Sequence, residues 1–595
     1  MSKTIRIGGA SGYWGDTAIG PVQLIRQGQV DYLIFDYLAE ITMSILAKAQ
    51  ARDPALGYAT DFIERVMAPL LPEIHRQGIK VIANAGGVNL TACRQALEKV
   101  AADAGLPLRI GTVEGDNLLP QVESVRALGP TELDTGAPLP AKLMSMNAYL
   151  GAFPIAAALD AGADIVLTGR CVDSALAVGP LIHEFGWRPD EYDRLAAGAL
   201  VGHVIECGAQ ATGGNYSDWP DTVDGWDDTG FPIAEVSANG AFVLTKPRDT
   251  GGTVTPFTAG EQMLYEIGDP GAYVLPDVIA DFRQVTLEQD GPDRVRIEGA
   301  RGHAPTDTYK VSATYADGFG CVGTFVIAGR DAATKARRQG EAVLKKVRRL
   351  LDQSELGDFS KTAMQLVGAE SSYGDHASDS ARQVREVVLR LGVHHPRREG
   401  VELFSKEFVG AGLSMAPGIT GLSPGRPRPT PIVRLFSFLI DKERVPVQVA
   451  VDGEPVSLAQ AAERGGGRPV ASQSDPAPAL EDSAVKVPLY RLAVARSGDK
   501  GDHANIGVIA RRPEYLPALR AALTEDAVAE RFSHTLKGKV ERFDLPGSHA
   551  MNFLLRHALD GGGVASLHLD AQAKTYAQVL LDMEIPVPEG LLSGS

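Results

Sequence analysis

Short apolar segments alternate with amphipathic segments through the first 200 residues of this 595-residue chain. The apolar segments, which have the length of buried strands, are residues 4–8, 32–35, 80–83 and 164–168. The segments with apolar residues at helical spacing are residues 38–50, 61–77, 147–161 and 173–185. Strands that alternate with helices build a parallel sheet covered on both faces. We therefore expect an α/β fold with a large, mostly parallel-sheet N-terminal region.

The pattern changes after Gly208. Residues 212–230 are rich in Gly, Asp and Trp without periodicity, which predicts a long ordered loop or lid. Strands are then predicted at residues 282–288, 294–298, 309–315 and 322–328, with a turn at Asp317-Gly318. A basic amphipathic helix over residues 331–351 follows, with its charges on a solvated face. These features indicate a mixed-strand insertion or second lobe, with a possible subdivision near residues 210–280.

Residues 465–484 lack periodicity and bulky apolar side chains, which is typical of a linker. We therefore expect an α/β domain at residues 1–464 and a small α+β domain at residues 485–595. In the small domain, strands are predicted at residues 489–495, 505–510, 539–543 and 565–569. Its predicted helices are residues 516–523, 551–559 and 576–582.

Charge and cysteine spacing exclude several classes of protein. The net charge of −16 argues against a nucleic-acid surface, although a local basic pocket for a phosphorylated ligand or coenzyme A remains compatible with it. The four cysteines form no CxxC pair, and neither CxxC nor HExxH spacing assigns a metal site. The N-terminus lacks a hydrophobic signal core and no apolar run reaches the roughly 20 residues of a membrane span, so we expect a cytoplasmic protein.

Polar residues follow the first predicted strands, at the edge where open parallel sheets bind ligands. Gly12 is a candidate for substrate binding, because it lies in a Gly-rich turn whose backbone amides can approach an anion, although the turn matches neither the dinucleotide nor the P-loop consensus. Asp16 after it is a candidate acid or base, or a helix cap. Asp36 and Glu40 are four residues apart. Such paired carboxylates can divide acid and base roles or bind a divalent cation, or they can simply favour the start of a helix.

Two later strand ends carry further candidates. Asn84, Gly86, Gly87 and Asn89, from the segment NAGGVN, can bind a carbonyl or phosphate, or can form a tight turn and a helix cap. After the strand at residues 164–168, Arg170 can hold a carboxylate or phosphate and Asp173 can act as an acid or base. The alternative is an ion pair between these two residues.

The densest cluster of reactive side chains lies at residues 203–210. His203 and Cys207 share a helical face, so the thiol could be a nucleophile beside its base, but Cys207 lacks a nucleophile signature. A substrate-lining role for His203, Glu206 or Gln210 is the preferred interpretation.

The predicted loop at residues 496–507 of the small domain carries more charge than a hairpin needs. Arg496, Lys500 and Asn505 are candidates to bind phosphate or carboxylate oxygens. The alternative is a polar turn in which Asp499 and Asp502 neutralise the neighbouring cations.

Taken in order, these motifs resemble the acyclic terpene utilisation (AtuA-type) family. The resemblance is carried by the turn with Asp16, the NAGGVN turn, Thr168-Gly169-Arg170 with Asp173, and the segment from Gly202 to Gly214. The loop at residues 496–507 is similar to the hallmark of the family's C-terminal ferredoxin-like domain. The resemblance implies a role in breaking down acyclic terpenoids or other branched acids as coenzyme A thioesters.

We therefore expect a non-redox enzyme, a lyase or hydratase, that acts on a carboxylate or acyl-CoA by hydration, dehydration or C–C cleavage. The predicted acids and bases are Asp16, Asp36, Glu40, Asp173, His203 and Glu206. The alternatives are a non-catalytic acyl-CoA-binding or scaffold partner, and metal-assisted hydrolysis through Asp16, Asp36 and Glu40. We expect no cofactor beyond coenzyme A as part of the substrate, no membrane or nucleic-acid partner, and a homo-oligomer.

Overall fold

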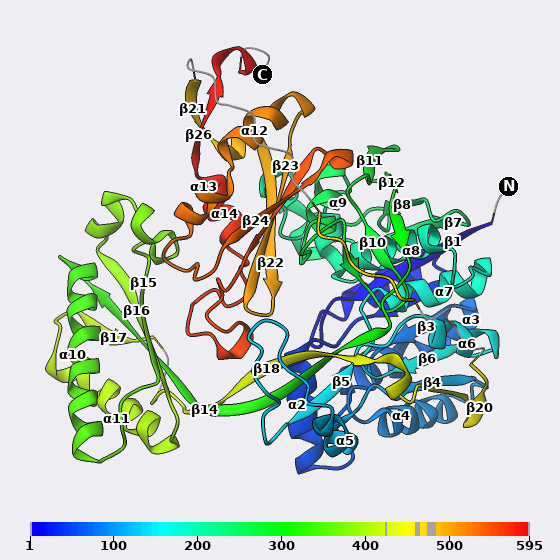
Figure 1. Cartoon of the computed structure of the whole chain (residues 1–595), viewed down its shortest axis with the longest axis horizontal. Helices are drawn as coiled ribbons and strands as arrows, with labels where there is room; N and C mark the ends of the chain where they lie inside the picture. The colour runs from blue at the N-terminus through cyan, green and yellow to red at the C-terminus, as the bar shows by residue number, and fades with distance from the viewer. Residues whose placement is uncertain (1–2, 423–424, 459–464, 473–483, 593–595) are drawn as a thin grey trace.

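Figure 1 shows the computed structural model, which describes residues 3–422, 425–458, 465–472 and 484–592. Within these residues, the large domain is built around one eleven-stranded sheet. The small C-terminal domain packs beside it, and a lobe formed by residues 317–422 and 425–430 extends to the left in Figure 1. None of the helices in the described part of the chain combines the length and apolar character that a membrane span requires.

The central sheet has the strand order β11-β12-β8-β7-β1-β2-β3-β6-β4-β19-β20. Its strands are β1 Thr4–Ser11, β2 Tyr32–Phe35, β3 Lys80–Ala83, β4 Ile110–Glu114, β6 Ile165–Thr168, β7 Ile233–Ser237, β8 Phe242–Thr245, β11 Thr286–Gln289, β12 Val295–Glu298, β19 Gln448–Val451 and β20 Glu454–Val456. A separate three-stranded sheet contains β9 Tyr273–Val274, β10 Ile279–Asp281 and β13 Arg301–His303.

The central sheet is mixed, so the prediction of a mostly parallel sheet is not confirmed. Strands β1, β2, β3, β6 and β4 run parallel. The strands on both sides of this group pair antiparallel. They are joined by short connections such as those between β7 and β8 and between β19 and β20, which can link only antiparallel neighbours. The alternation of strands and helices therefore identified the parallel centre and missed the antiparallel edges.

Helices cover both faces of the parallel strands, and strand β2 shows why. All four of its residues are buried, and alternate side chains enter opposite cores. Tyr32 and Ile34 pack on the face covered by α6, α7 and α8, whereas Leu33 and Phe35 pack on the face covered by α1, α2, α3 and α4. These helices are α1 Ile19–Gln27, α2 Glu40–Arg52, α3 Ala68–Gln77, α4 Leu90–Asp103, α6 Phe153–Asp160, α7 Ala175–Phe185 and α8 Tyr192–Ile205.

Strand β14 (Thr308–Ala328) connects the large domain to the lobe (Figure 1). Its first half pairs with β18 and β5, and its second half pairs with β16 and β17. The predicted turn at Asp317-Gly318 is wrong: the strand continues through an irregularity between Ala316 and Phe319, where Gly318 takes φ +77°. The remaining elements of this region are α5 Val122–Ala127, β5 Ser145–Ala148, α10 Ala332–Gln353, β15 Lys361–Val367, β16 Glu386–His395, α11 Arg398–Ser414, β17 Ile419–Gly421 and β18 Thr430–Asp441.

The small domain contains a four-stranded antiparallel sheet, β22-β23-β25-β24, and the pair β21-β26. The predicted helix at residues 551–559 is wrong, because residues 550–555 form the buried strand β25. A fully buried strand and a buried helix cannot be told apart by periodicity alone. No strand forms at residues 565–569. The elements of the small domain are β21 Ala484–Pro488, β22 Ala493–Lys500, β23 His503–Ala510, α12 Leu516–Ala522, α13 Glu525–Arg531, β24 Val540–Leu545, β25 Ala550–Leu555, α14 Tyr576–Leu581 and β26 Glu584–Pro588. Helix α9 of the large domain, Pro256–Met263, faces this domain.

The predicted linker at residues 465–484 is described only in part. Residues 465–472 run along the large domain, where the Gly467 amide donates to the Pro305 carbonyl at 3.0 Å. The Ser472 amide donates to a carboxylate oxygen of Asp269 at 2.7 Å. Residues 473–483 lie outside the described residues.

A tight contact between β1 and the end of α8 makes a test of this fold. A Cβ atom on Gly9 would lie 2.1 Å from the Ile205 carbonyl oxygen, whereas one on the exposed Gly410 of α11 would meet nothing within 4 Å. We expect Gly9→Ala to lower the free energy of unfolding by about 1–3 kcal/mol through overpacking. The matched Gly410→Ala should raise it by up to about 1 kcal/mol, because alanine is the better helix former. Calorimetric unfolding checks both, and a Gly9→Ala variant as stable as the wild type would contradict the packing described.

Candidate active site

A cavity of about 1280 Å³ opens between the two domains at the carboxyl ends of the parallel strands. Its inner wall consists of residues that follow β1, β2, β6 and α8. The opposite wall comes from the hairpin β22–β23, the residues after β25, and the paired strands β14 and β18. Open α/β sheets bind ligands at this edge. Here the small domain lines the same space as the sheet.

Three carboxylates converge on the inner wall. Asp36, Asp173 and Glu206 each place an oxygen within 4.8 Å of the other two. Asp36 and Glu206 are buried, and Asp173 is half-buried. They come from three separate strand and helix ends, so the fold brings together candidates that lie up to 170 residues apart in the sequence.

The contacts of His203 indicate the protonation state of Glu206. His203 is buried, and burial lowers its pKa to about 4, so the imidazole is neutral at physiological pH. Its Nε2 lies 3.1 Å from the Met263 carbonyl, which can only accept a hydrogen bond. The proton of the neutral ring is therefore on Nε2, and Nδ1 accepts. Glu206 Oε1, 3.2 Å from Nδ1, must then carry the proton of the second hydrogen bond.

The surroundings of Glu206 favour the same state. Burial, and then the negative charges of Asp173 and Glu266, raise the pKa of Glu206 well above its ordinary value, against the opposing effect of Lys500 and Arg170. Glu206 thus lines the cavity as a carboxyl group in its protonated form.

Asp36 is held by its neighbour Asn84. Asn84 Nδ2 donates to Asp36 Oδ1 at 2.6 Å, while Asn84 Oδ1 accepts from the Tyr37 amide at 2.7 Å. Burial and the charge of Asp173 raise the pKa of Asp36 well above its ordinary value, and Arg170 and Asn84 oppose this. Asn84 does not line the cavity, so it fixes Asp36 from behind.

Two cations face the carboxylates from different domains. Arg170 donates to Asp173 Oδ1 at 2.6 Å, and its guanidinium stacks on the Tyr149 ring at 4.2 Å. Lys500 lies at the tip of β22, with its Nζ 5.5 Å from the centre of the Tyr273 ring. Its side chain is exposed and lines the cavity. Desolvation opposes its charge, but nearby groups, including Tyr273 and Glu266, raise the pKa of Lys500, which therefore stays protonated.

Glu40 differs from the other carboxylates. Lys310 lies 3.5 Å from Glu40 Oε1, and the Tyr149 hydroxyl donates to the same oxygen. Burial would raise the pKa of Glu40, but Lys310, Arg170 and Tyr149 together lower it to about 2. Glu40 is therefore a permanent carboxylate rather than a proton donor.

Three other predicted residues line the cavity. Asp16 accepts hydrogen bonds from the Gly12 amide at 2.9 Å and the Thr17 amide at 2.7 Å, so it also stabilises its own turn. Gly12 permits the close approach of Cys207, whose backbone would lie 2.9 Å from an added Cβ. Gln210 contributes from the segment after α8.

The predicted residues Gly86, Gly87 and Asn89 do not line the cavity. Asn89 caps α4 by accepting from the Ala92 amide at 3.3 Å, and Gly86 and Gly87 form the tight turn before it.

Cys207 lines the cavity, but burial and Glu206 raise its pKa well above the ordinary value. Since both ring nitrogens of His203 have other partners, His203 does not activate this thiol.

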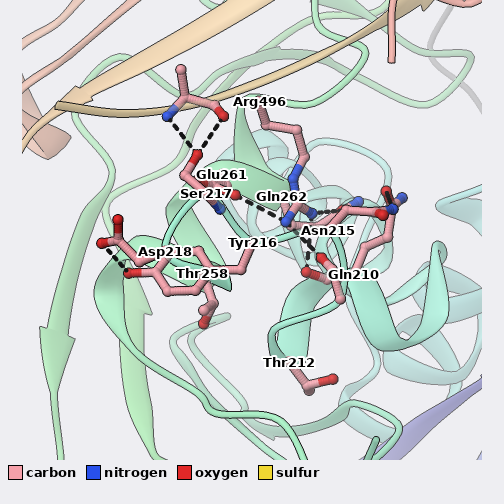
Figure 2. A network of polar contacts seen from close by, with 12 residues as sticks. Gln210, Thr212, Asn215, Tyr216, Ser217, Asp218, Thr258, Glu261, Gln262 and Arg496 are labelled. Atoms are coloured by element: carbon pink, nitrogen blue, oxygen red, sulfur yellow. Dashed lines mark hydrogen bonds and ion pairs between the residues drawn. The ribbon is translucent and has the colours of Figure 1, made fainter. Parts of the chain in front are cut away.

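Arg496 and Asn505 lie on strands at the domain interface, not in a loop that faces the cavity. The predicted loop at residues 496–507 is therefore wrong: β22 continues to Lys500, and only Gly501 and Asp502 form the turn. Arg496 is 4% exposed and pairs with Glu261 at 3.0 Å (Figure 2). Asn505 donates to the Leu264 carbonyl at 2.6 Å and accepts from the Glu266 amide at 2.8 Å.

Sequence reasoning missed Asp116, Glu266 and Lys310. Asp116 is buried after β4 and accepts the Arg170 amide and the Asn147 side chain, both at 2.8 Å, so it positions Arg170. Asp36 was predicted because it follows a strand. Asp116 also follows a strand, β4, and would have been predicted had residues 110–114 been recognised as one. Glu266 and Lys310 line the cavity from segments with no local signal.

Two family models match this chain. The model of the acyclic terpene utilisation family protein AtuA matches residues 5–451, and that of the AtuA ferredoxin-like domain matches residues 487–586. The chain belongs to the AtuA family. No curated protein and no solved structure matches it. The AtuA family is implicated in acyclic terpene utilisation, and in this member the two AtuA domains share one cavity.

The cavity shared by the AtuA domains is acidic. Among the described residues that line it, twelve are Asp or Glu and six are Lys or Arg. Four of these cations already contact a carboxylate, in the pairs Arg170–Asp173, Lys310–Glu40, Arg434–Asp317 and Arg556–Glu541. The lining therefore offers few free positive charges to a polyanionic ligand.

The same convergence could hold a divalent cation. Carboxylate oxygens are the ligands that Mg²⁺ and Ca²⁺ prefer, and those of Asp36, Asp173 and Glu206 are close enough to share one ion. This trio differs from the one predicted from the sequence, because Asp16 and Glu40 are engaged elsewhere.

The buried Asp116 gives a pH-dependent test of the wall behind Arg170. Burial raises its pKa to about 6, so the folded state binds the proton more tightly than the unfolded chain. Stability should therefore fall as the pH rises from about 4 to about 7, at a cost of about 3 kcal/mol. An Asp116→Asn side chain cannot titrate, yet its Oδ1 can accept both hydrogen bonds. We expect the stability of the variant, relative to wild type, to increase over this range in urea unfolding; parallel curves would contradict the account.

Proposed function

We propose that the protein is an acid–base enzyme that adds or removes water, or cleaves a C–C bond, in an acyclic branched substrate of terpenoid breakdown. The supporting observation is the position of Glu206, a protonated carboxyl group that lines the cavity beside a neutral His203. Protonation of an alkene, a hydroxyl or a carbonyl oxygen requires such a donor.

The remaining groups supply the complementary roles. Asp173, which accepts from Arg170 at 2.6 Å, is positioned as the base that takes a proton from water or from a carbon beside a carbonyl. Arg170 and Lys500 are placed to stabilise negative charge that develops on a carboxylate or enolate oxygen. An oxygen of Asp36 lies within 4.8 Å of oxygens of Asp173 and Glu206, so Asp36 completes the proton-sharing group.

The charge of the lining bears on the form of the substrate. A coenzyme A thioester would bring several phosphate charges to a wall in which acidic side chains outnumber basic ones two to one. The free terpenoid acid or alcohol is therefore our preferred substrate inside the cavity. The acyl-CoA form stays a prediction that the same assay tests.

Turnover by purified protein tests the proposal. The protein would be incubated with acyclic terpenoid acids and alcohols and with their coenzyme A thioesters, and gain or loss of water or of a carbon fragment followed by mass spectrometry. We expect Glu206→Gln to lower kcat by about 10²–10⁴-fold, because the amide cannot donate a carboxylic proton. Glu123→Gln, an exposed carboxylate outside the cavity, is the matched control. Full activity in Glu206→Gln would sink the acid role, and binding without turnover by the wild type would favour a non-catalytic partner.

Metal-assisted chemistry is a second candidate, favoured by the mutual approach of the oxygens of Asp36, Asp173 and Glu206. Under the acid–base proposal, turnover survives dialysis against a chelator, and elemental analysis of active protein finds no stoichiometric metal. Activity that is lost on chelation and restored by one divalent cation would instead establish the metal-assisted reaction.

A further inference from the structure

Two walls of the cavity come from different domains, and their separation decides whether Glu206 and Lys500 can act on one substrate. The segment at residues 206–214 follows α8 and supplies Glu206, Gln210 and Gly214 to the cavity. The β22–β23 hairpin supplies Asp499 and Lys500. Arg496 precedes Lys500 by four residues on the same strand.

The Arg496 guanidinium binds the opposite wall directly (Figure 2). It donates to the Gln210 carbonyl at 3.0 Å and to the Gly214 carbonyl at 2.8 Å. Both acceptors belong to residues that line the cavity. The same group pairs with Glu261 at 3.0 Å, and Arg496 and Glu261 are 4% and 1% exposed.

The network continues from Arg496 to the helix end that carries Glu206. Arg496 donates to Gln262 Oε1 at 3.4 Å, and Gln262 Nε2 donates to the His203 carbonyl at 3.2 Å. Glu261 also accepts from the Ser217 amide at 3.2 Å, and the Ser217 hydroxyl donates to the Ala495 carbonyl at 2.8 Å. Ser217 therefore contacts both Glu261 and the residue that precedes Arg496.

We propose that Arg496 is a positioning residue that sets the distance between Glu206 and Lys500 by binding the carbonyls of residues 210 and 214. The proposal rests on the function proposed above. Only a planar guanidinium reaches these carbonyls and Glu261 at once, because its donors point in fixed, divergent directions. A lysine at this position keeps the positive charge but lacks the divergent N–H donors of the guanidinium, so it cannot bind both carbonyls and Glu261 together. The segment at residues 206–214 is then free to shift relative to the β22–β23 hairpin.

A second interdomain ion pair provides the matched control. Arg511 holds Asp218 through two hydrogen bonds of 2.6 Å, so it joins the same two domains. Neither residue lines the cavity, and the pair is partly exposed. Arg511→Lys therefore weakens the interface by a comparable change without releasing residues 206–214.

Steady-state kinetics and amide hydrogen exchange test the proposal together. We expect Arg496→Lys to lower kcat by about 10- to 100-fold with KM changed by less than about twofold, because misplacement of a catalytic group acts on the transition state. Amides of residues 206–214 should exchange faster, whereas those of the small domain keep their protection. Arg511→Lys should show neither effect. Glu261→Gln, which keeps the shape of the acceptor, serves if Arg496→Lys does not fold, and should reproduce its kinetics and exchange.

Equal behaviour of Arg496→Lys and Arg511→Lys, or a rise in KM with unchanged kcat, would overturn the positioning role. Its failure is distinguishable from failure of the proposed function. If Glu206→Gln keeps full activity, the acid role is lost, and hydrogen exchange at residues 206–214 still decides whether Arg496 holds that wall.

Discussion

The site depends on two cations from different domains that face a group of buried carboxylates. Burial raises the pKa of Asp36 and of Glu206, and each carboxylate disfavours the charge of the next. Arg170, from the end of β6, opposes this effect at both carboxylates, and Lys500, from the small domain, opposes it at Glu206. The ferredoxin-like domain therefore belongs to the electrostatics of the site. Without Lys500, the buried Glu206 would hold its proton more tightly.

The polar interface explains how Lys500 reaches its place. Asn505 and Asn552 are fully buried and bind the backbone of residues 264–268, and Arg496 binds that of residues 210 and 214. Such groups add little net stability, because their desolvation offsets most of the gain. A shifted domain would leave them unpaired in the interior, which is costly. The interface thus selects one relative position of the two domains.

The sequence predicted those residues of the candidate site that follow parallel strands, and their role stays a prediction. Asp36, Arg170 and Asp173 were found because a strand end is a local feature, and the parallel centre of the sheet brings such ends together. The antiparallel edges, the strand β25 and the interface roles of Arg496 and Asn505 were not found. Arg496 meets Glu261 across 235 positions of sequence, and no local pattern encodes that contact. The many charged residues marked the β22–β23 hairpin as unusual in the sequence. Only the structure shows that Arg496 is buried at the domain interface and that Lys500 lines the cavity.

The central claim is that both domains bind one substrate, and a crystal structure with an acyclic terpenoid acid bound to the wild-type protein tests it most directly. The account predicts ligand density in the interdomain cavity, with a polar end within hydrogen-bond distance of Glu206 and Lys500 together. Density that contacts only one domain, or that lies outside this cavity, would contradict the shared site.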